Sequence, residues 1–173
     1  MRVACTVMCL FLLATMLYAC RGIGRKSTLD VVPSVDLERY IGTWHEIARY
    51  PNSFQKEDCV ATTATYELRD DGKINVLNIC RKGSPNGPEN TATGKAWVVD
   101  TETNARIKVQ FFWPFSGDYW IIQLGEHYEY AVVGHPDRKY LWILSRTPEM
   151  KPELYSRILA RLKEQGFDPG RRI

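Results

Sequence analysis

The feature that most limits the fold of this chain is a series of eight apolar segments that repeat with the period of β-strands. The segments are residues 44–50, 60–68, 73–80, 94–100, 105–112, 118–124, 128–134 and 140–146. Residues that favour turns separate them, such as Arg69-Asp70-Asp71-Gly72 and Ser84-Pro85-Asn86-Gly87-Pro88. Eight strands at short, even spacing predict an all-β domain, either an antiparallel up-and-down barrel or a sandwich.

The size and charge of the chain limit the number of domains and the kinds of ligand that we expect. With 173 residues, of which 45% are apolar, it can form one domain with a real core but not two full domains. The formal charge is only +3, and the Lys and Arg residues are scattered rather than clustered. We therefore expect no binding of nucleic acid, which requires a basic patch.

One helix is predicted at the C-terminal end, over residues 152–165. Leu154, Ile158 and Leu162 recur at spacings of four and form an apolar face, and Gly166 ends the helix. The strand at 140–144 is apolar on both faces and needs cover on each side. We expect the helix to pack on its outer face; a helix lying on a membrane surface is the alternative.

The N-terminal segment is predicted to be a signal peptide, residues 1–19, because a short positive start precedes an apolar run. An uncleaved membrane anchor is the alternative. The sequence Leu17-Tyr18-Ala19-Cys20 resembles the lipobox of bacterial lipoproteins, although Tyr18 replaces the usual small residue. That resemblance implies acylation of Cys20 by chains such as palmitate. It also implies sorting to the outer membrane, since Arg21 rather than Asp follows, with residues 20–35 as lipidated N-terminus and tether.

Three motifs occur in an order that resembles the lipocalin family, and within it the outer-membrane lipoproteins of bacteria. They are Gly42-Thr43-Trp44, the stretch 136–140, and Arg146 at the end of the last strand. The resemblance covers roughly residues 36–167 and implies a lipocalin domain over 36–173. Its fold is an eight-stranded antiparallel up-and-down barrel with the helix packed outside. In that family the Trp plugs the closed end of the barrel and the Arg lies across its ring, an arrangement that cation–π attraction favours.

The resemblance also implies a ligand inside the barrel. Strand alternation together with the resemblance predicts that the binding residues are Tyr66, Val109, Phe111, Trp120, Ile122, Tyr128 and Trp142. The expected ligand is a fatty acid or a lysophospholipid, stored or transported in the periplasm with its carboxylate or phosphate at the barrel mouth. The alternative is that these side chains fill a solid core.

Cys59 and Cys80 are the two cysteines of the predicted domain, and an envelope location permits a disulfide between them. If the turn at 69–72 pairs Leu68 with Lys73, Cys59 lies diagonal to Cys80 on one face of the sheet. A bulge would shorten that diagonal to bonding distance. Two buried free thiols are the alternative.

Enzymatic and metal sites are weakly supported by the sequence. His45, His127 and His135 lie on separate segments without the spacing of metal ligands, so we expect no metal, no cofactor and no catalytic residue. Two alternatives to a carrier stay open. A charged triad in the barrel would favour a lipocalin-fold enzyme, and an exposed apolar patch would favour an interaction protein of the envelope. The sequence does not decide between a monomer and a homodimer.

Overall fold

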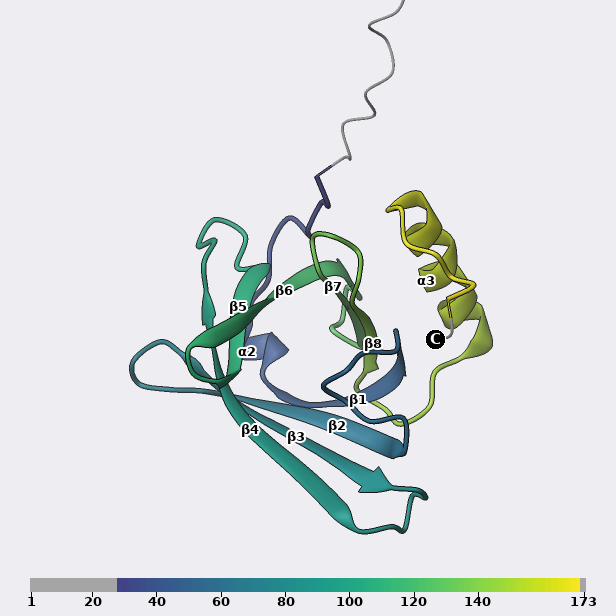
Figure 1. Cartoon of the computed structure of the whole chain (residues 1–173). Coiled ribbons are helices and arrows are strands. Elements are labelled where there is room, and N and C mark those ends of the chain that lie inside the picture. Colours follow the sequence, from purple (N-terminus) through teal and green to yellow (C-terminus); the bar gives the residue numbers. More distant parts are fainter. Residues whose placement is uncertain (1–27, 172–173) are drawn as a thin grey trace, which may run out of the picture.

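The computed structural model describes residues 28–171. Its eight strands form one closed antiparallel barrel, in which each strand pairs with the next and β8 pairs with β1 (Figure 1). The strands are β1 (Gly42–Arg49), β2 (Cys59–Leu68), β3 (Ile74–Lys82), β4 (Glu89–Val98), β5 (Arg106–Phe112), β6 (Phe115–Leu124), β7 (Tyr130–Gly134) and β8 (Leu141–Ser145). The predicted eight-stranded barrel is confirmed, and the sandwich is excluded.

β4 and β6 begin earlier than the hydrophobic pattern indicated. The polar start of β4, from Glu89, pairs with β3, and the Arg81 guanidinium lies 2.6 Å from the Glu89 carboxylate. β6 begins at Phe115, which pairs with Phe112 across a tight hairpin. Backbone pairing between neighbouring strands thus extends both strands through residues that contribute nothing to the core.

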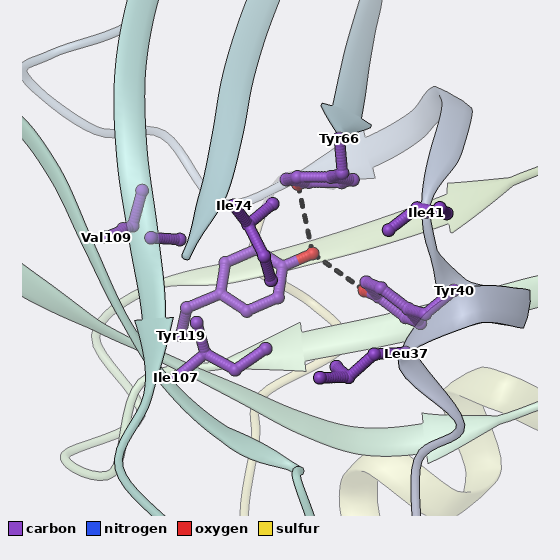
Figure 2. Close-up of a pocket in the computed structure, with 9 residues that line it drawn as sticks. Leu37, Tyr40, Ile41, Tyr66, Ile74, Ile107, Val109 and Tyr119 are labelled. Carbon is purple, nitrogen blue, oxygen red and sulfur yellow. Dashed lines mark hydrogen bonds between the residues drawn. The ribbon is translucent and has the colours of Figure 1, made fainter. Parts of the chain in front are cut away.

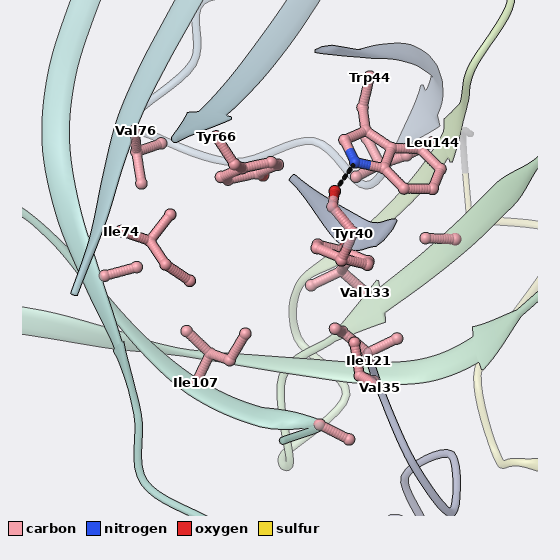
Figure 3. Close-up of a cluster of buried hydrophobic side chains, with 13 residues drawn as sticks. Val35, Tyr40, Trp44, Tyr66, Ile74, Val76, Ile107, Ile121, Val133 and Leu144 are labelled. Carbon is pink, nitrogen blue, oxygen red and sulfur yellow. Dashed lines mark hydrogen bonds between the residues drawn. The ribbon is translucent and has the colours of Figure 1, made fainter. Parts of the chain in front are cut away.

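The closed end of the barrel is covered by the short helix α2 (Leu37–Tyr40). The Asp36 carboxylate caps it by accepting from the backbone N–H groups of Glu38 and Arg39. Tyr40 points from α2 into the barrel (Figure 3). Because β1 starts beside α2 and neighbouring strands are antiparallel, the loops β1–β2, β3–β4, β5–β6 and β7–β8 surround the opposite, open end.

Buried side chains form two clusters, one inside the barrel and one outside it. The interior cluster consists of Val35, Tyr40, Trp44, Tyr66, Ile74, Val76, Ala96, Ala105, Ile107, Ile121, Ala131, Val133 and Leu144 (Figure 3). The outer cluster consists of Leu29, Ala48, Tyr50, Ile122, Val132, Leu141, Ile143, Ile158, Leu162 and Phe167. The apolar strand β8 contributes to both, as its sequence predicted.

The helix α3 (Pro152–Glu164) packs outside the barrel and supplies the cover for the outer cluster (Figure 1). Its apolar face buries Ile158 and Leu162. Gly166 follows with a positive φ of 81°, a conformation that favours glycine, and Phe167 then packs back onto the barrel. The predicted helix outside the barrel is confirmed.

The packed domain begins before its predicted start at residue 36. Leu29 is only 2% exposed, and the backbone N–H groups of Val32 and Val35 donate to the carbonyls of Ile121 and Thr103. Residues 29–35 therefore belong to the fold and not to the tether, a correction that sequence composition alone did not indicate. The predicted signal peptide and residues 20–27 of the predicted tether, including Cys20, lie outside the described residues. Within residues 28–171, neither helix is long and apolar enough to cross a membrane.

Strands β2 and β3 pair one residue out of the predicted register, with Leu68 opposite Ile74 rather than Lys73. A bulge between Val60 and Thr63, where Ala61 has a φ of 47°, shifts the pairing again toward the open end. Cys59 and Cys80 lie beside this bulge and are joined by a disulfide, with their Cα atoms 5.4 Å apart. The bulge in β2 thus brings the Cα atoms of Cys59 and Cys80 close enough for a disulfide.

Candidate functional site in the barrel lumen

A Trp–Arg pair closes the base of the barrel interior, or lumen. Trp44 is fully buried, and its Nε1 donates to the Tyr40 carbonyl at 2.8 Å (Figure 3). The Arg146 Cζ lies 3.8 Å from the centre of the Trp44 ring. Gly42 has a φ of 92°, and a Cβ at that position would lie 3.4 Å from the Arg146 guanidinium. A side chain there would be strained and would crowd the arginine.

Arg146, which follows β8, also connects the barrel to α2 through hydrogen bonds. Its guanidinium donates to four backbone carbonyls, those of Arg39, Tyr40, Ile41 and Thr43, at 2.6–3.1 Å. Burial lowers the pKa of Arg146, while the nearby Tyr40 and Tyr119 hydroxyls act in the opposite direction. Three of these carbonyls lie at the C-terminal end of α2, where a cation is favourable, and the Thr43 carbonyl lies in β1, so this contact stabilises the closed end.

Three tyrosines form the floor of the lumen just above this plug. The Tyr119 hydroxyl lies 2.7 Å from that of Tyr40 and 3.0 Å from that of Tyr66 (Figure 2). Burial raises the pKa of Tyr66 to about 12 and raises the pKa values of Tyr40 and Tyr119 well above their ordinary value. All three therefore stay neutral at physiological pH.

A cavity beside these tyrosines has a volume of about 10 Å³, which is room for about one water molecule. Its lining is Leu37, Tyr40, Ile41, Tyr66, Ile74, Ala96, Ile107, Val109 and Tyr119 (Figure 2). The deepest part of the lumen is thus almost filled by side chains. A chain-shaped ligand has to lie above the floor, toward the open end.

Apolar side chains line part of the lumen above the floor. Phe111 and Trp142, together with Val109 at the edge of the floor cavity, pack against the interior cluster but remain partly exposed. Gly94 makes room for Phe111, since a Cβ there would lie 2.8 Å from the Phe111 ring. Phe54 from the β1–β2 loop stacks on Trp142 with ring centres 6.2 Å apart. Of the predicted ligand-binding residues, Tyr66, Val109, Phe111 and Trp142 therefore face the lumen.

The prediction that Trp120 and Ile122 line the lumen is wrong. Both pack with the outer cluster beneath α3, and the Arg106 guanidinium lies 5.0 Å from the Trp120 ring centre. The β6 residues that pack with the interior cluster are Tyr119, Ile121 and Leu124. Because both faces of this strand are covered, its sequence is apolar on both faces and alternation did not identify the inner one.

Tyr128 lies at the closed end and not near the mouth. Its hydroxyl accepts from the Asp36 backbone N–H at 2.8 Å, and the Arg39 guanidinium covers its ring at 4.1 Å. It lies in the β6–β7 turn, where its φ is 60°. These contacts hold α2 in position. Tyr128 therefore does not line the upper lumen.

A polar wall, which the sequence did not predict, occupies one side of the upper lumen. It consists of Glu46, Arg49, Gln55, Thr62 and Asn78. Glu46 pairs with Leu144 and Arg49 pairs with Trp142, both of which face inward, so the two charged residues share that face. A bulge between Glu46 and Ala48 turns Arg49 inward. Asn78 lies on β3 in alternation with the interior residues Ile74 and Val76.

The members of the polar wall on β1, β2 and the β1–β2 loop are bonded to one another. The Arg49 guanidinium donates to the Glu46 carboxylate at 2.6 Å. The Gln55 amide donates to both Glu46 oxygens, at 3.2 and 2.9 Å, and to the Thr62 hydroxyl at 3.1 Å. The Glu46 and Arg49 side chains are only 9% and 18% exposed. Among the described residues, no three or more His, Cys, Asp and Glu side chains are placed to hold a metal ion.

Exposed aromatic side chains occur on loops at the open end. Phe112, Trp113 and Phe115 form the tip of the β5–β6 hairpin and are 77%, 84% and 77% exposed. We call these three residues the β5–β6 tip. Large aromatic side chains grouped on a surface commonly mark a contact with a partner or a membrane.

Comparisons with known proteins agree with this architecture. Residues 35–172 match the sequence profile of the lipocalin-like domain. The chain is 43% identical to the outer membrane lipoprotein Blc of Escherichia coli, covering 90% of this chain and 86% of that protein. It is 39% identical to temperature-induced lipocalin-1 of Arabidopsis thaliana, covering 83% and 80%. The structure of insecticyanin from Manduca sexta superposes with a TM-score of 0.63 at 23% identity, covering 85% and 84%.

Proposed function

The chain belongs to the lipocalin family, and we propose that it stores or transports one single-chain lipid, a fatty acid or a lysophospholipid, in its barrel lumen. Lipocalins are binding and transport proteins for small hydrophobic ligands, which supports this assignment. The observation that carries the proposal is a lumen closed at one end by Trp44 and Arg146 and lined above its floor by Phe111 and Trp142.

The depth of the lumen suits one acyl chain. Tyr66 at the floor and Cys59 at the open end are seven positions apart on β2. At about 3.3 Å per residue and a strand tilt of about 40°, this corresponds to roughly 18 Å along the barrel axis. A single chain would lie beside Phe111 and Trp142, with its polar head close to the open end.

The arrangement of charged groups supports binding over catalysis. Within residues 28–171, Glu46 is the acidic residue of the polar wall, and both of its carboxylate oxygens already accept hydrogen bonds from Arg49 or Gln55. These three bonds leave the carboxylate only one of about four acceptor positions, so it is poorly placed to take a substrate proton as a general base. We therefore propose a carrier and not an enzyme.

Native mass spectrometry tests the carrier proposal without assuming a particular ligand. The protein is purified from a bacterial envelope without added lipid and sprayed under gentle conditions. We expect a population heavier than the bare chain by the mass of one lipid, which organic extraction removes. A chain that carries no lipid, and that also binds none of a panel of fatty acids and lysophospholipids, would contradict the proposal.

We further propose that acylated Cys20 anchors the domain to the periplasmic face of the outer membrane. Support comes from the lipobox-like sequence and from the 43% identical Escherichia coli relative, which is an outer membrane lipoprotein. Three acyl chains on one N-terminus would exceed the two signals that stable anchoring requires. Residues 20–27 would then connect the anchor to the domain.

The β5–β6 tip favours a second candidate function, direct contact with a lipid surface. Trp and Phe prefer the interface between water and a bilayer, and three such residues are exposed on one hairpin. The test compares Trp113→Ser with Val99→Ser, both in a Cys20→Ser background, by sedimentation with phosphatidylethanolamine–phosphatidylglycerol vesicles. Val99 is 51% exposed at the closed end. Loss of vesicle binding only in Trp113→Ser supports the contact, whereas equal binding by both variants removes it.

A further inference from the structure

The polar wall of the upper lumen carries no net charge. Glu46 and Arg49 neutralise each other at 2.6 Å, and Gln55, Thr62 and Asn78 are neutral side chains. An ionised ligand head placed against this wall would lose its hydration, and no unpaired opposite charge on the wall would compensate for that loss. The wall therefore suits a head that is polar but uncharged.

Asn78 is the member of the wall that lacks a partner. Its Oδ1 is buried and accepts no hydrogen bond, although buried carbonyl oxygens are normally satisfied. On the inner face it stands between two small side chains, its strand partners Ala64 on β2 and Ala92 on β4. An unfilled acceptor is satisfied by a ligand group that donates a hydrogen, such as a hydroxyl, and a carboxylate has none to give.

We propose that the polar wall selects lipids with an uncharged, hydroxyl-bearing head over free fatty acids of the same chain length. A ligand hydroxyl donates to Asn78 Oδ1 and a second oxygen of the head accepts from Arg49, whose charge Glu46 balances. The apolar chain then runs past Phe111 toward the tyrosine floor. The inference rests on the carrier function proposed above and names the class of head that the same lumen prefers; a fatty acid still binds, but more weakly.

The experiment measures the affinities of two ligands with the same acyl chain, monolauroylglycerol and laurate. Both are titrated calorimetrically at pH 7.5, below their aggregation concentrations, into the folded chain. One satisfied hydrogen bond and one avoided desolvated charge predict that monolauroylglycerol binds about tenfold more tightly. A tighter affinity for laurate would overturn the proposal while leaving the carrier function intact. Binding of neither ligand would overturn both.

Two substitutions test the residues, and a third serves as a matched control. Asn78→Leu removes the acceptor and should lower the preference for monolauroylglycerol about tenfold. Asn75→Leu makes the same change on the outer face of the same strand and should leave the preference unchanged. Equal preferences in these two variants would contradict the role of Asn78.

Glu46→Gln tests the charge balance independently. Its amide oxygen can still accept from Arg49, but the wall gains one positive charge. The affinity for laurate should rise about tenfold relative to monolauroylglycerol. Urea denaturation checks that each variant is folded before titration. An unchanged ratio in a folded Glu46→Gln variant would refute the claim that neutrality of the wall sets the preference.

Discussion

Truncating the ring at the base of the barrel, Trp44→Ala, should remove most of the stability of the domain. Loss of a large buried aromatic side chain costs about 3–5 kcal/mol through lost burial and the cavity that remains. Trp44 is fully buried and holds the Arg146 guanidinium 3.8 Å from its ring centre, a contact that contributes about 1–2 kcal/mol when desolvated. The total approaches the 5–15 kcal/mol by which a whole domain is stable.

Urea denaturation followed by far-UV circular dichroism measures this loss, and Trp113→Ala provides the matched control. Trp113 undergoes the same chemical change but is 84% exposed, so its free energy of unfolding should stay within about 0.5 kcal/mol of the parent. Trp44→Phe should fall between the two, since it keeps a ring but loses the hydrogen bond to Tyr40. If Trp44→Ala loses less than about 1 kcal/mol, Trp44 does not hold the closed end together.

Further predictions concern the anchor, the lumen, the disulfide and the tyrosine floor. Cys20→Ser should release the chain from the membrane fraction or leave it uncleaved, and normal fractionation of a cleaved chain would exclude the anchor. Trp142→Ala should remove apolar contact worth about 1–3 kcal/mol and so weaken fatty-acid binding about five- to a hundredfold, which calorimetric titration measures. Reducing the Cys59–Cys80 bond, which spans a sequence separation of 21, should cost about 3 kcal/mol in urea denaturation with and without reductant. Stability should also decline as the pH rises from about 10 to 12, because Tyr66 ionises near its ordinary pKa when unfolded and only at about 12 when folded; pH-dependent denaturation checks this.

The number of strands and the outer helix could be predicted because each depends on local patterns, whereas the choice of a barrel over a sandwich rested on the resemblance to lipocalins. Turn residues separate the strands, and the helix has a regular apolar face. The inner face of β6 could not be predicted in the same way. Trp120 and Ile122 are as apolar as Tyr119 and Ile121, since α3 and the N-terminal segment cover the outside of that strand. Period-two alternation identifies the inner face only where the outer face meets water.

The polar wall was beyond sequence reasoning for a different reason. In an amphipathic strand, Glu46 and Arg49 would ordinarily face water, and their separation of three places them on opposite faces of a regular strand. The bulge at Ile47 brings them to one face, and Gln55 reaches them only through the course of the β1–β2 loop. A bulge and a long loop have no reliable local signal, so the polar side of the lumen becomes visible only in three dimensions.

Locating a bound chain by nuclear magnetic resonance tests the central claim most directly, because it asks whether the lipid lies inside the barrel. A fatty acid with an isotope-labelled acyl chain is added to the protein, and nuclear Overhauser contacts are recorded to assigned methyl groups. We predict contacts to Val109 and Ala64, which face the lumen, and none to Val132 or Ile143 of the outer cluster. Contacts confined to the outer cluster, or none with saturating lipid, would contradict the account of a lipid carried in the lumen.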